Sequence, residues 1–331
     1  MEKIQFPNTK KKASRIGLGT WAIGEWMWGP QSKEDSLATI KAALDKGVSL
    51  IDTAPAYGFG KSEEIIGQAI EEYGGRDDII IATKVTIDWD KDHHVYRNGS
   101  EERIFQEIED SLERLRTDFI DLYQVHWPDP LTPIKETAKA MKELYEEGLI
   151  GAIGVSNYSP EQMEEFRNYA PLHTCQPPYN ILERQIEDDI IPYCEKNEIY
   201  LITYGALCRG MLSGKMSKER EFEGDDLRNT DPKFEEPRFS QYLEAVDKLE
   251  NFARNKYDKE LISLAVRWIL DQGVETALWG ARKPSQVEPF ENVMGWNLNE
   301  KDLQEIKTIV DEAVKDPVGP EFMAPPTREE K

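Results

Sequence analysis

Four side chains suited to proton transfer stand at the ends of apolar runs or just beyond them. Asp52 ends one run, the Pro/Gly loop after it carries Tyr57, and Lys84 and His126 directly follow two further runs. An ammonium group beside a phenol favours the phenolate and lowers its pKa from roughly 10, so we interpret Tyr57 as a general acid tuned by Lys84. Asp52 would orient and neutralise Lys84, while His126 would direct a substrate oxygen. This set suits protonation of a carbonyl oxygen as a hydride reaches the carbon.

Each of these residues also has an ordinary structural interpretation. A strand-end aspartate is often a cap, a strand-end lysine is often a solvated rim charge, and a single histidine is more often structural than catalytic. The functional interpretation depends on joint placement, because the ends of consecutive parallel strands meet at one rim of a barrel. We therefore expect Asp52, Tyr57, Lys84 and His126 to lie together.

Short strand-like runs alternate with helical runs, which predicts an α/β fold with a parallel sheet. The expected helices are 33–46, 62–72, 101–116, 133–147, 160–168, 186–196 and 259–270. The expected strands are 16–19, 49–52, 79–83, 119–125, 150–155, 173–176, 199–204 and 275–278. Eight strands favour a (β/α)8 TIM barrel. The alternative is an open doubly wound sheet, which the glycine spacing at Gly17 and Gly19 disfavours, because it does not match Gly-x-Gly-x-x-Gly.

Three segments fall outside the eightfold pattern. Residues 1–15 are expected to form a hairpin cap that closes the barrel floor. Residues 205–237, after the seventh strand, form a long loop of the kind that binds ligands. The Pro-rich tail 316–331 cannot continue a helix and is expected to be an extended strap. The composition shows no break, so we expect residues 1–331 to form a single domain.

Composition narrows the classes of partner. The net charge of −22 argues against nucleic acid as a ligand. No run approaches the roughly 20 apolar residues that span a bilayer, and no signal peptide is evident. The three cysteines predict neither a disulfide framework nor a zinc site, and His93-His94 lacks a third metal ligand, so no metal is expected. A small-molecule ligand, a cytoplasmic location and a monomer or weak homo-oligomer are the resulting expectations.

The chain closely resembles the aldo-keto reductases, on motifs that extend from Arg15 to about Asn292. The stretch 51–63 matches that family's first signature, 154–157 its mid-chain motif, and 205–215 its cofactor loop. The likeness is strongest to the bacterial branch that includes the general stress proteins of bacilli. It implies an NADPH-dependent carbonyl reductase that acts on an aldehyde or ketone. It also implies that Asp52, Tyr57, Lys84 and His126 are its catalytic residues.

The resemblance also implies a set of cofactor residues. Ser156 and Asn157 resemble the pair that binds the nicotinamide carboxamide, with Gln176 assisting, and Tyr204 resembles the aromatic residue on which the ring stacks. Arg282 resembles the contact to the 2′-phosphate, and Gln286 an adenosine contact. The remaining residues of the predicted NADPH/NADP+ site are Thr20, Trp21, Asp52, Gly205, Ala206, Leu207, Cys208, Arg209, Gly210, Lys215, Arg228, Gly280, Ala281 and Lys283.

Charge patterning supports a phosphate ligand independently of the resemblance. In this acidic chain a group of basic residues gathers in or beside the loops after the seventh and eighth strands, where such barrels tend to bind phosphate. Glycines in the first of these loops allow backbone amides to approach an anion closely. The alternative is a few basic residues scattered on a flexible loop. The basic group comprises Arg209, Lys215, Arg228, Arg282 and Lys283.

The substrate pocket is expected to be aromatic. Trp21, Trp26, Trp28, Trp89 and Trp127 fall on predicted rim loops, although several of them could simply be packing. We expect the pocket to be formed by Trp21, Trp26, Trp89 and Trp127. The tail residues Phe322 and Met323 are interpreted as part of a surface strap rather than as a lid.

Two other functions fit parts of the pattern. A lyase that forms a Schiff base on Lys84 would need no nicotinamide, but it would not explain the paired Asp52 or the basic loops. A redox-sensing regulatory subunit would keep the cofactor site and turn over slowly. It would be recognised by a stable partner and negligible turnover.

Overall fold

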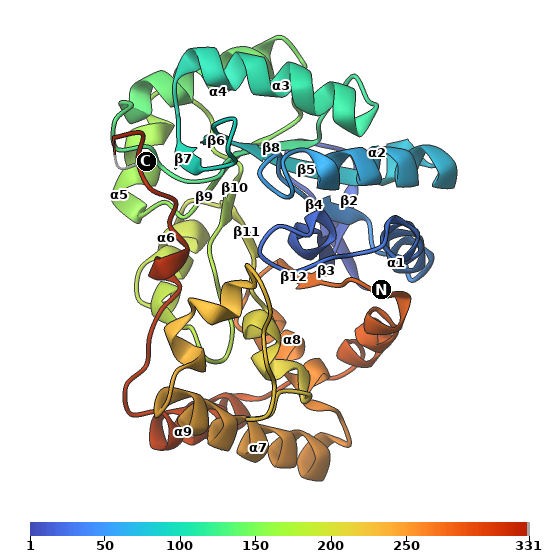
Figure 1. Cartoon of the computed structure of the whole chain (residues 1–331), viewed down its shortest axis with the longest axis vertical. Helices are drawn as coiled ribbons and strands as arrows, with labels where there is room; N and C mark the ends of the chain where they lie inside the picture. Colours follow the sequence, from blue (N-terminus) through green and yellow to red (C-terminus); the bar gives the residue numbers. More distant parts are fainter. Residues whose placement is uncertain (330–331) are drawn as a thin grey trace.

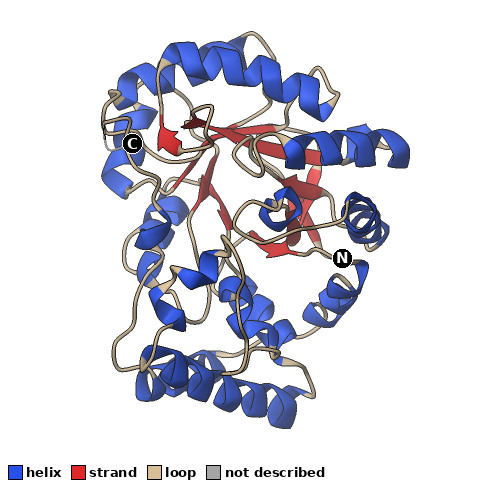
Figure 2. Ribbon diagram, in the orientation of Figure 1, coloured by secondary structure: helices blue, strands red, loops and turns tan. Residues whose placement is uncertain are grey.

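The computed structural model of the chain describes residues 1–329. Parallel strands close into a central barrel with helices around it, as Figure 2 shows. The barrel strands, in order around the ring, are β3 (Ile16–Gly19), β4 (Leu50–Asp52), β5 (Ile80–Val85), β8 (Leu122–Val125), β9 (Ile153–Ser156), β10 (Thr174–Gln176), β11 (Tyr200–Thr203) and β12 (Thr276–Gly280). Each predicted strand overlaps one of these, so the predicted (β/α)8 barrel is confirmed.

The helices of the described chain include all seven that were expected. They are α1 (Lys33–Asp45), α2 (Lys61–Tyr73), α3 (Glu101–Leu115), α4 (Ile134–Glu146), α5 (Pro160–Arg167), α6 (Ile190–Lys196), α7 (Arg238–Tyr257), α8 (Leu261–Asp271) and α9 (Glu300–Ala313). The helices α7 and α9 were not predicted. They lie outside the strand–helix alternation and pack against each other at the lower edge of Figure 1. None of the described helices is long and apolar enough to cross a bilayer.

Two antiparallel hairpins flank the barrel. The predicted N-terminal hairpin consists of β1 (Lys3–Gln5) and β2 (Lys12–Ser14). Phe6 in its turn is fully buried, and its ring centroid lies 5.3 Å from that of Tyr200 on β11, so the hairpin closes the barrel floor. The second hairpin, β6 (Ile87–Trp89) and β7 (Val95–Arg97), was not predicted. It follows β5 directly, in a region interpreted as a loop.

The barrel interior is apolar near the floor and polar near the opposite rim. Because side chains alternate along a strand, residues two apart point to the same face. The buried apolar cluster inside the barrel includes Leu50 and Leu122, together with Phe6 of the hairpin. Two residues further along the same strands stand Asp52 and Gln124, both buried. The strand pattern therefore delivers polar side chains to one end of a hydrophobic cylinder.

The C-terminal tail crosses that polar end. In Figure 1 it runs from α9 to the C-terminus near α5. The Lys233 ammonium donates to the carbonyl of Gly319, and the backbone N–H of Arg97 donates to Pro326 at 2.9 Å. Further along, Arg328 pairs with Asp129 at 2.9 Å. The tail is thus held on both sides of the barrel mouth, and the last two residues of the predicted strap, 330 and 331, lie outside the described residues.

Candidate active site

Three of the predicted reactive groups meet around one ammonium group. The Nζ atom of Lys84 lies 2.5 Å from Oδ1 of Asp52, 2.9 Å from the carbonyl oxygen of Thr53 and 3.3 Å from the hydroxyl of Tyr57. Lys84 is fully buried, and these three contacts use its three protons. Strand β4 supplies the acid, the loop between β4 and α2 supplies the phenol, and β5 supplies the amine. The geometry therefore matches the expected acid–amine–phenol arrangement.

The fourth predicted residue, His126, follows β8 and faces the phenol. Its ring centroid lies 5.7 Å from that of Tyr57, edge to face. Burial and the charge of Lys84 lower the pKa of His126 well below its usual value. The imidazole is therefore neutral near pH 7, and a neutral ring can still donate one hydrogen bond to an oxygen in the cavity.

The pKa of Tyr57 moves in the direction opposite to the expectation. Burial, and then the negative charge of Asp52, raise the pKa of the Tyr57 hydroxyl well above its usual value. Burial also lowers the pKa of Lys84, and the attraction of Asp52 opposes that shift. The negative charge of Asp52 opposes the attraction that the Lys84 ammonium would exert on a phenolate. The hydroxyl is consequently protonated at neutral pH, as a proton donor must be.

A cavity of about 220 Å³ opens directly onto Tyr57 and His126. Its walls are mainly apolar, and its polar lining atoms come from few side chains. Lys84 is not among the lining residues, because it lies behind the phenol. Those lining residues are Trp21, Trp26, Met27, Tyr57, Ile87, Val95, His126, Trp127, Ser156, Asn157, Gln176, Tyr204, Leu227, Thr230 and Phe322 to Pro326.

The tail forms part of this cavity, so the interpretation of Phe322 and Met323 as part of a surface strap was wrong. Five consecutive residues, 322–326, line it. Nothing in the composition of the tail indicates this, because the contact depends on two anchors that lie far away in sequence. Residues Glu321–Met323 form a short 3-10 helix at the opening, and Pro325 and Pro326 prevent it from continuing.

The tryptophans divide into two groups. Trp21, Trp26 and Trp127 line the cavity as expected, and Trp21 stacks on the ring of Tyr57 with centroids 5.8 Å apart. Trp89 does not line it. Trp89 lies on β6, where its ring contacts Phe59, with centroids 5.5 Å apart, so the unpredicted hairpin draws it out of the pocket.

The residues assigned to the nicotinamide lie on the same cavity and fit that group. Asn157 donates to Ser156 and accepts from the Tyr204 hydroxyl at 2.8 Å. The Gln176 amide nitrogen donates to Asp52 at 2.8 Å, while its amide oxygen has no hydrogen bond among residues 1–329. The Gln176 amide oxygen can therefore accept from a carboxamide N–H group. The Ser156 hydroxyl donates to the Gln176 carbonyl and the Asn157 amide to the His126 carbonyl, so these two side chains would exchange those bonds for ones to the carboxamide. Thr20, by contrast, is buried, and its hydroxyl donates to the backbone of Asp52.

Arg209, predicted to bind phosphate, is held in a buried ion cluster. Its guanidinium pairs with Glu183 at 2.5 Å and with Asp231 at 2.7 Å. Lys233 also pairs with Glu183, at 2.8 Å, and is fully buried. We call Glu183, Arg209, Asp231 and Lys233 the loop cluster. Its two cations and two anions compensate one another, so Arg209 is not oriented toward an external anion.

The first part of the long loop contains glycines in the left-handed region of backbone conformation. The glycines Gly205, Gly210 and Gly214 have φ values of 75°, 90° and 71°, which other residues rarely adopt. Lys215 is exposed. Ala206 and Cys208 are buried and Leu207 is half-buried, so their side chains belong to the core.

Two predicted basic residues converge at another point on the rim. Arg282 donates to the carbonyl of Trp28 at 2.8 Å, and burial together with the charge of Arg228 lowers the pKa of Arg282. Arg228 itself pairs with Asp226 at 2.5 Å. The Gln286 amide oxygen accepts from the backbone N–H groups of Arg282 and Lys283 at 2.7 and 3.1 Å. Of the two residues before Arg282, Gly280 is exposed and Ala281 is buried.

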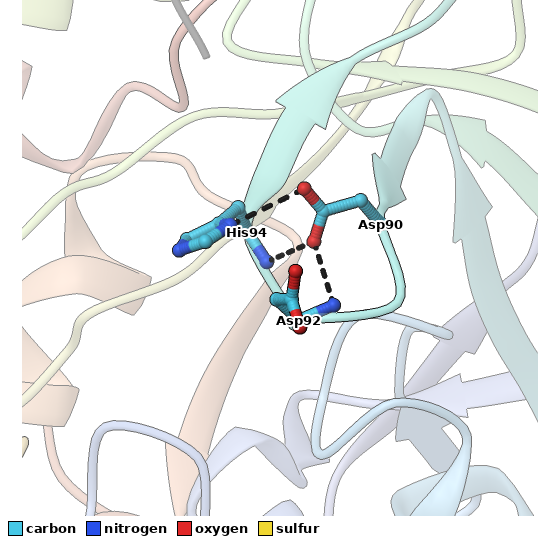
Figure 3. Close-up of side chains that lie close together, drawn as sticks. All are labelled: Asp90, Asp92 and His94. Atoms are coloured by element: carbon cyan, nitrogen blue, oxygen red, sulfur yellow. Dashed lines mark hydrogen bonds and ion pairs between the residues drawn. The ribbon is translucent and has the colours of Figure 1, made fainter.

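One group of possible metal ligands lies on the turn between β6 and β7. Figure 3 shows Asp90, Asp92 and His94 close together, and their ligand atoms lie within 4.8 Å of one another. From the sequence we considered His93 and His94 as possible ligands, but not these two aspartates. Asp90 already accepts the backbone N–H groups of Asp92 and His94, at 2.9 and 3.0 Å. Those bonds shape the turn without an ion.

Known proteins resemble this chain over most or all of its length. A model of the aldo/keto reductase family matches residues 15–311. The aldo-keto reductase YhdN of Bacillus subtilis is 60% identical over 331 residues, covering 100% of both chains. An NADH-specific methylglyoxal reductase of Escherichia coli is 36% identical, covering 91% of this chain and 95% of its own. A solved glycerol dehydrogenase of Gluconobacter oxydans superposes with a TM-score of 0.89 at 49% identity, covering 97% of this chain and 99% of its own.

Proposed function

The chain belongs to the aldo/keto reductase family, and we propose that it reduces small aldehydes or ketones with a hydride from NADPH. The observation that carries this proposal is the 3.3 Å contact between the Lys84 ammonium and the Tyr57 hydroxyl, at a cavity that His126 also lines. A proton donor, a cation beside it and a neutral imidazole suit the reduction of a carbonyl group.

The residues then take separate roles. A bound reduced nicotinamide supplies the hydride to the carbonyl carbon. Tyr57 donates its proton to the carbonyl oxygen, and Lys84 stabilises the phenolate that remains. Neutral His126 donates a hydrogen bond to the same oxygen and fixes its direction. The pKa of Tyr57 is raised, so the cation at 3.3 Å matters most once the proton has left.

Ser156, Asn157 and Gln176 would hold the carboxamide, and the ring of Tyr204 would form the wall behind the nicotinamide. These residues line the cavity beside Tyr57, which supports the assignment. We further propose that residues 1–331 act as one domain, as a monomer or weak homo-oligomer in the cytoplasm. The catalytic rim is completed by the tail, which favours a single unit.

We propose NADPH rather than NADH because Arg228 and Arg282 converge at the rim despite their mutual repulsion. Two such cations in a chain of net charge −22 suit a 2′-phosphate. The E. coli relative is NADH-specific by name, so cofactor choice varies among relatives of this chain. Arg282 now bonds backbone carbonyls of the loop at residues 28–30, and a phosphate would have to replace those bonds.

The Schiff-base alternative fits the geometry poorly. A nucleophilic lysine must be neutral and reach the substrate. Lys84 donates three hydrogen bonds and lies behind Tyr57. The rate of NADPH consumption distinguishes the regulatory-subunit alternative from the proposed enzyme. A carbonyl reductase consumes NADPH steadily when an aldehyde is added, whereas a regulatory subunit would consume it slowly.

The test of the proposal is Tyr57→Phe. We expect kcat for aldehyde reduction to fall by roughly 10²–10⁴-fold, because the proton donor is lost. The dissociation constant for NADPH should stay within about twofold, since the hydroxyl acts chiefly in the transition state. Stopped-flow absorbance and fluorescence titration measure the two quantities. Tyr73→Phe, at an exposed tyrosine, is the control; an equal loss of cofactor affinity in Tyr57→Phe would make that residue structural.

Cofactor choice is tested by Arg282→Ala. Loss of a charge-assisted phosphate contact costs about 1.5–3 kcal/mol, so the ratio of kcat/KM for NADPH to that for NADH should fall by roughly 10–100-fold. Arg254→Ala, at a more exposed arginine on α7, should leave the ratio unchanged. An unchanged ratio in Arg282→Ala would refute the assignment of this residue.

A further inference from the structure

The second carboxylate oxygen of Asp52 is held by two glutamines rather than by Lys84. Its Oδ2 atom accepts from the amide nitrogen of Gln176 at 2.8 Å and from that of Gln124 at 3.1 Å. Both glutamines are at most 2% exposed. Gln176 also lines the cavity, whereas Gln124 does not. Gln124 therefore reaches the reacting groups through Asp52, and its one direct neighbour on the cavity wall is Gln176.

The orientation of the Gln124 amide is determined by its neighbours. Its oxygen accepts from Gln176 at 3.2 Å while its nitrogen donates to Asp52. Reversing the amide would direct its oxygen at the carboxylate and leave Gln176 facing an N–H group. Both ends of the side chain are thus in use.

The barrel leaves space for this side chain at Gly154 on β9. A Cβ atom at that position would lie 2.9 Å from the Cγ atom of Gln124 and 2.3 Å from the Thr174 hydroxyl oxygen. Real Cβ atoms do not approach so closely. The neighbouring strand therefore has a glycine where a larger residue would displace Gln124 from Asp52.

From these contacts, and resting on the proposed function, we propose that Gln124 is a positioning residue for proton donation by Tyr57. It donates to the charged form of Asp52 without adding charge, which stabilises the carboxylate. Asp52 in turn holds the Lys84 ammonium between the carboxylate and the phenol. The path runs from Gln124 to Asp52, then to Lys84, then to the Tyr57 hydroxyl, with contacts of 3.1, 2.5 and 3.3 Å.

Few charged groups surround Gln124. Asp52 on β4 and Lys84 on β5 face it inside the barrel, and Gly154 on β9 and Gln176 on β10 are uncharged. The groups beyond them that titrate are Tyr57 and His126 at the cavity, together with Glu63, whose charge acts on Lys84 from α2. A change at Gln124 therefore acts first on Asp52 and Gln176, and on Lys84 through Asp52.

Two substitutions of Gln124 have opposite expected effects on the pH profile of kcat. In Gln124→Leu the Asp52 carboxylate loses one of its two amide donors, so kcat should fall roughly 10-fold, and the loss should be greatest at the acid end of the pH range. In Gln124→Glu a protonated carboxyl can still donate to Asp52, so kcat should stay within about threefold at the acid end. As that carboxyl ionises it repels Asp52, so kcat should fall roughly 10–100-fold toward pH 8.

The measurement is kcat from pH 5 to 9 with saturating NADPH, alongside the KM for NADPH and the thermal unfolding midpoint. Tyr123→Phe is the matched control, because that hydroxyl is on the same strand, buried and without a hydrogen bond among the described residues. It should leave the profile unchanged. Profiles of the two Gln124 variants that match the wild type, or that shift in the same direction, would overturn the proposal. A wild-type chain that reduces no carbonyl with either nicotinamide would instead refute the proposed function.

Discussion

Two buried ion clusters lie at the same end of the barrel and differ in what surrounds them. The loop cluster combines two cations with two anions. Burial alone would raise the pKa of Glu183, but the charges of Arg209 and Lys233 lower it to about 2. Around Lys84 there is one anion for one cation, and burial lowers the pKa of Lys84. The charges of the loop cluster balance one another. The group around Lys84 ends at the Tyr57 hydroxyl, which is a proton donor.

The cover over each cluster differs as well. The Phe322 ring lies over the loop cluster, with its centroid 5.6 Å from the Arg209 guanidinium and 5.8 Å from the Lys233 ammonium. The phenol of Tyr57 separates Lys84 from a cavity. A compensated and covered cluster suits a structural role, because nothing in it has to change charge. A cluster that ends in a protonated phenol at a cavity suits chemistry.

Lys84→Met should give the largest effect and act on function. We expect kcat/KM to fall by roughly 10²–10⁴-fold, because the cation that stabilises the phenolate is lost. The free energy of unfolding should fall by less than in Glu183→Gln, since Asp52 keeps the amide donors of Gln124 and Gln176. Steady-state kinetics and urea unfolding measure the two effects.

The control is Lys142→Met at an exposed lysine of α4, which should change neither quantity appreciably. If Lys84→Met instead lowers the free energy of unfolding but keeps its activity per folded molecule, the group around Lys84 would be structural rather than catalytic.

Glu183→Gln should act mainly on stability. Removing one partner of a buried pair costs roughly 3–5 kcal/mol, so the unfolding free energy at pH 7 should fall by that amount while kcat changes little. The pKa of Glu183 is lowered on folding, so its contribution is present above about pH 4.5 and is lost as the pH falls through about 2. The difference between wild type and variant should therefore shrink by about 3 kcal/mol on going from pH 7 to pH 2.

Urea unfolding at several pH values measures this difference. Asp45→Asn, at an exposed pair on α1, should give a much smaller change at every pH. A pH-independent difference between wild type and Glu183→Gln would show that the carboxylate of Glu183 is not the group whose charge matters.

Phe322→Ala should give the smallest effect and act on both regions. Loss of the ring widens the cavity and uncovers the loop cluster. We expect the kcat/KM of a bulky aromatic aldehyde relative to that of acetaldehyde to rise by roughly two- to tenfold, since a side chain contributes on the order of 1 kcal/mol at such a site. The neighbouring Glu321→Gln, outside the cavity lining, is the control. An unchanged ratio would show that the tail does not limit substrate size.

The sequence was sufficient for the barrel and for the residues at its rim. Alternation along β4, β5 and β8 assigns Asp52, Lys84 and Gln124 to the interior face. The same alternation could have singled out Gln124, because it follows Leu122 by two residues inside a strand that was predicted. It was overlooked because a neutral amide does not by itself suggest acid–base chemistry.

The sequence was not sufficient for the pairing of charges or for the tail. Arg209 was expected to face phosphate because it lies in the loop after the seventh strand, where such barrels tend to bind phosphate, yet Glu183, 26 residues away, pairs with it. The hairpin that draws Trp89 from the pocket was also missed. An ion pair such as that of Glu183 and Arg209 leaves no periodic pattern in the chain.

Local periodicity alone thus determined the cylinder and the group of an acid, an amine, a phenol and an imidazole at its open end, because strand alternation and strand order require only neighbouring residues. Only the folded chain decided which charges neutralise one another and what covers the cavity. Those contacts join residues as distant as Asp52 and Gln176, 124 positions apart, and Asp129 and Arg328, 199 apart. They depend on burial and on three-dimensional proximity, which the order of residues does not encode locally.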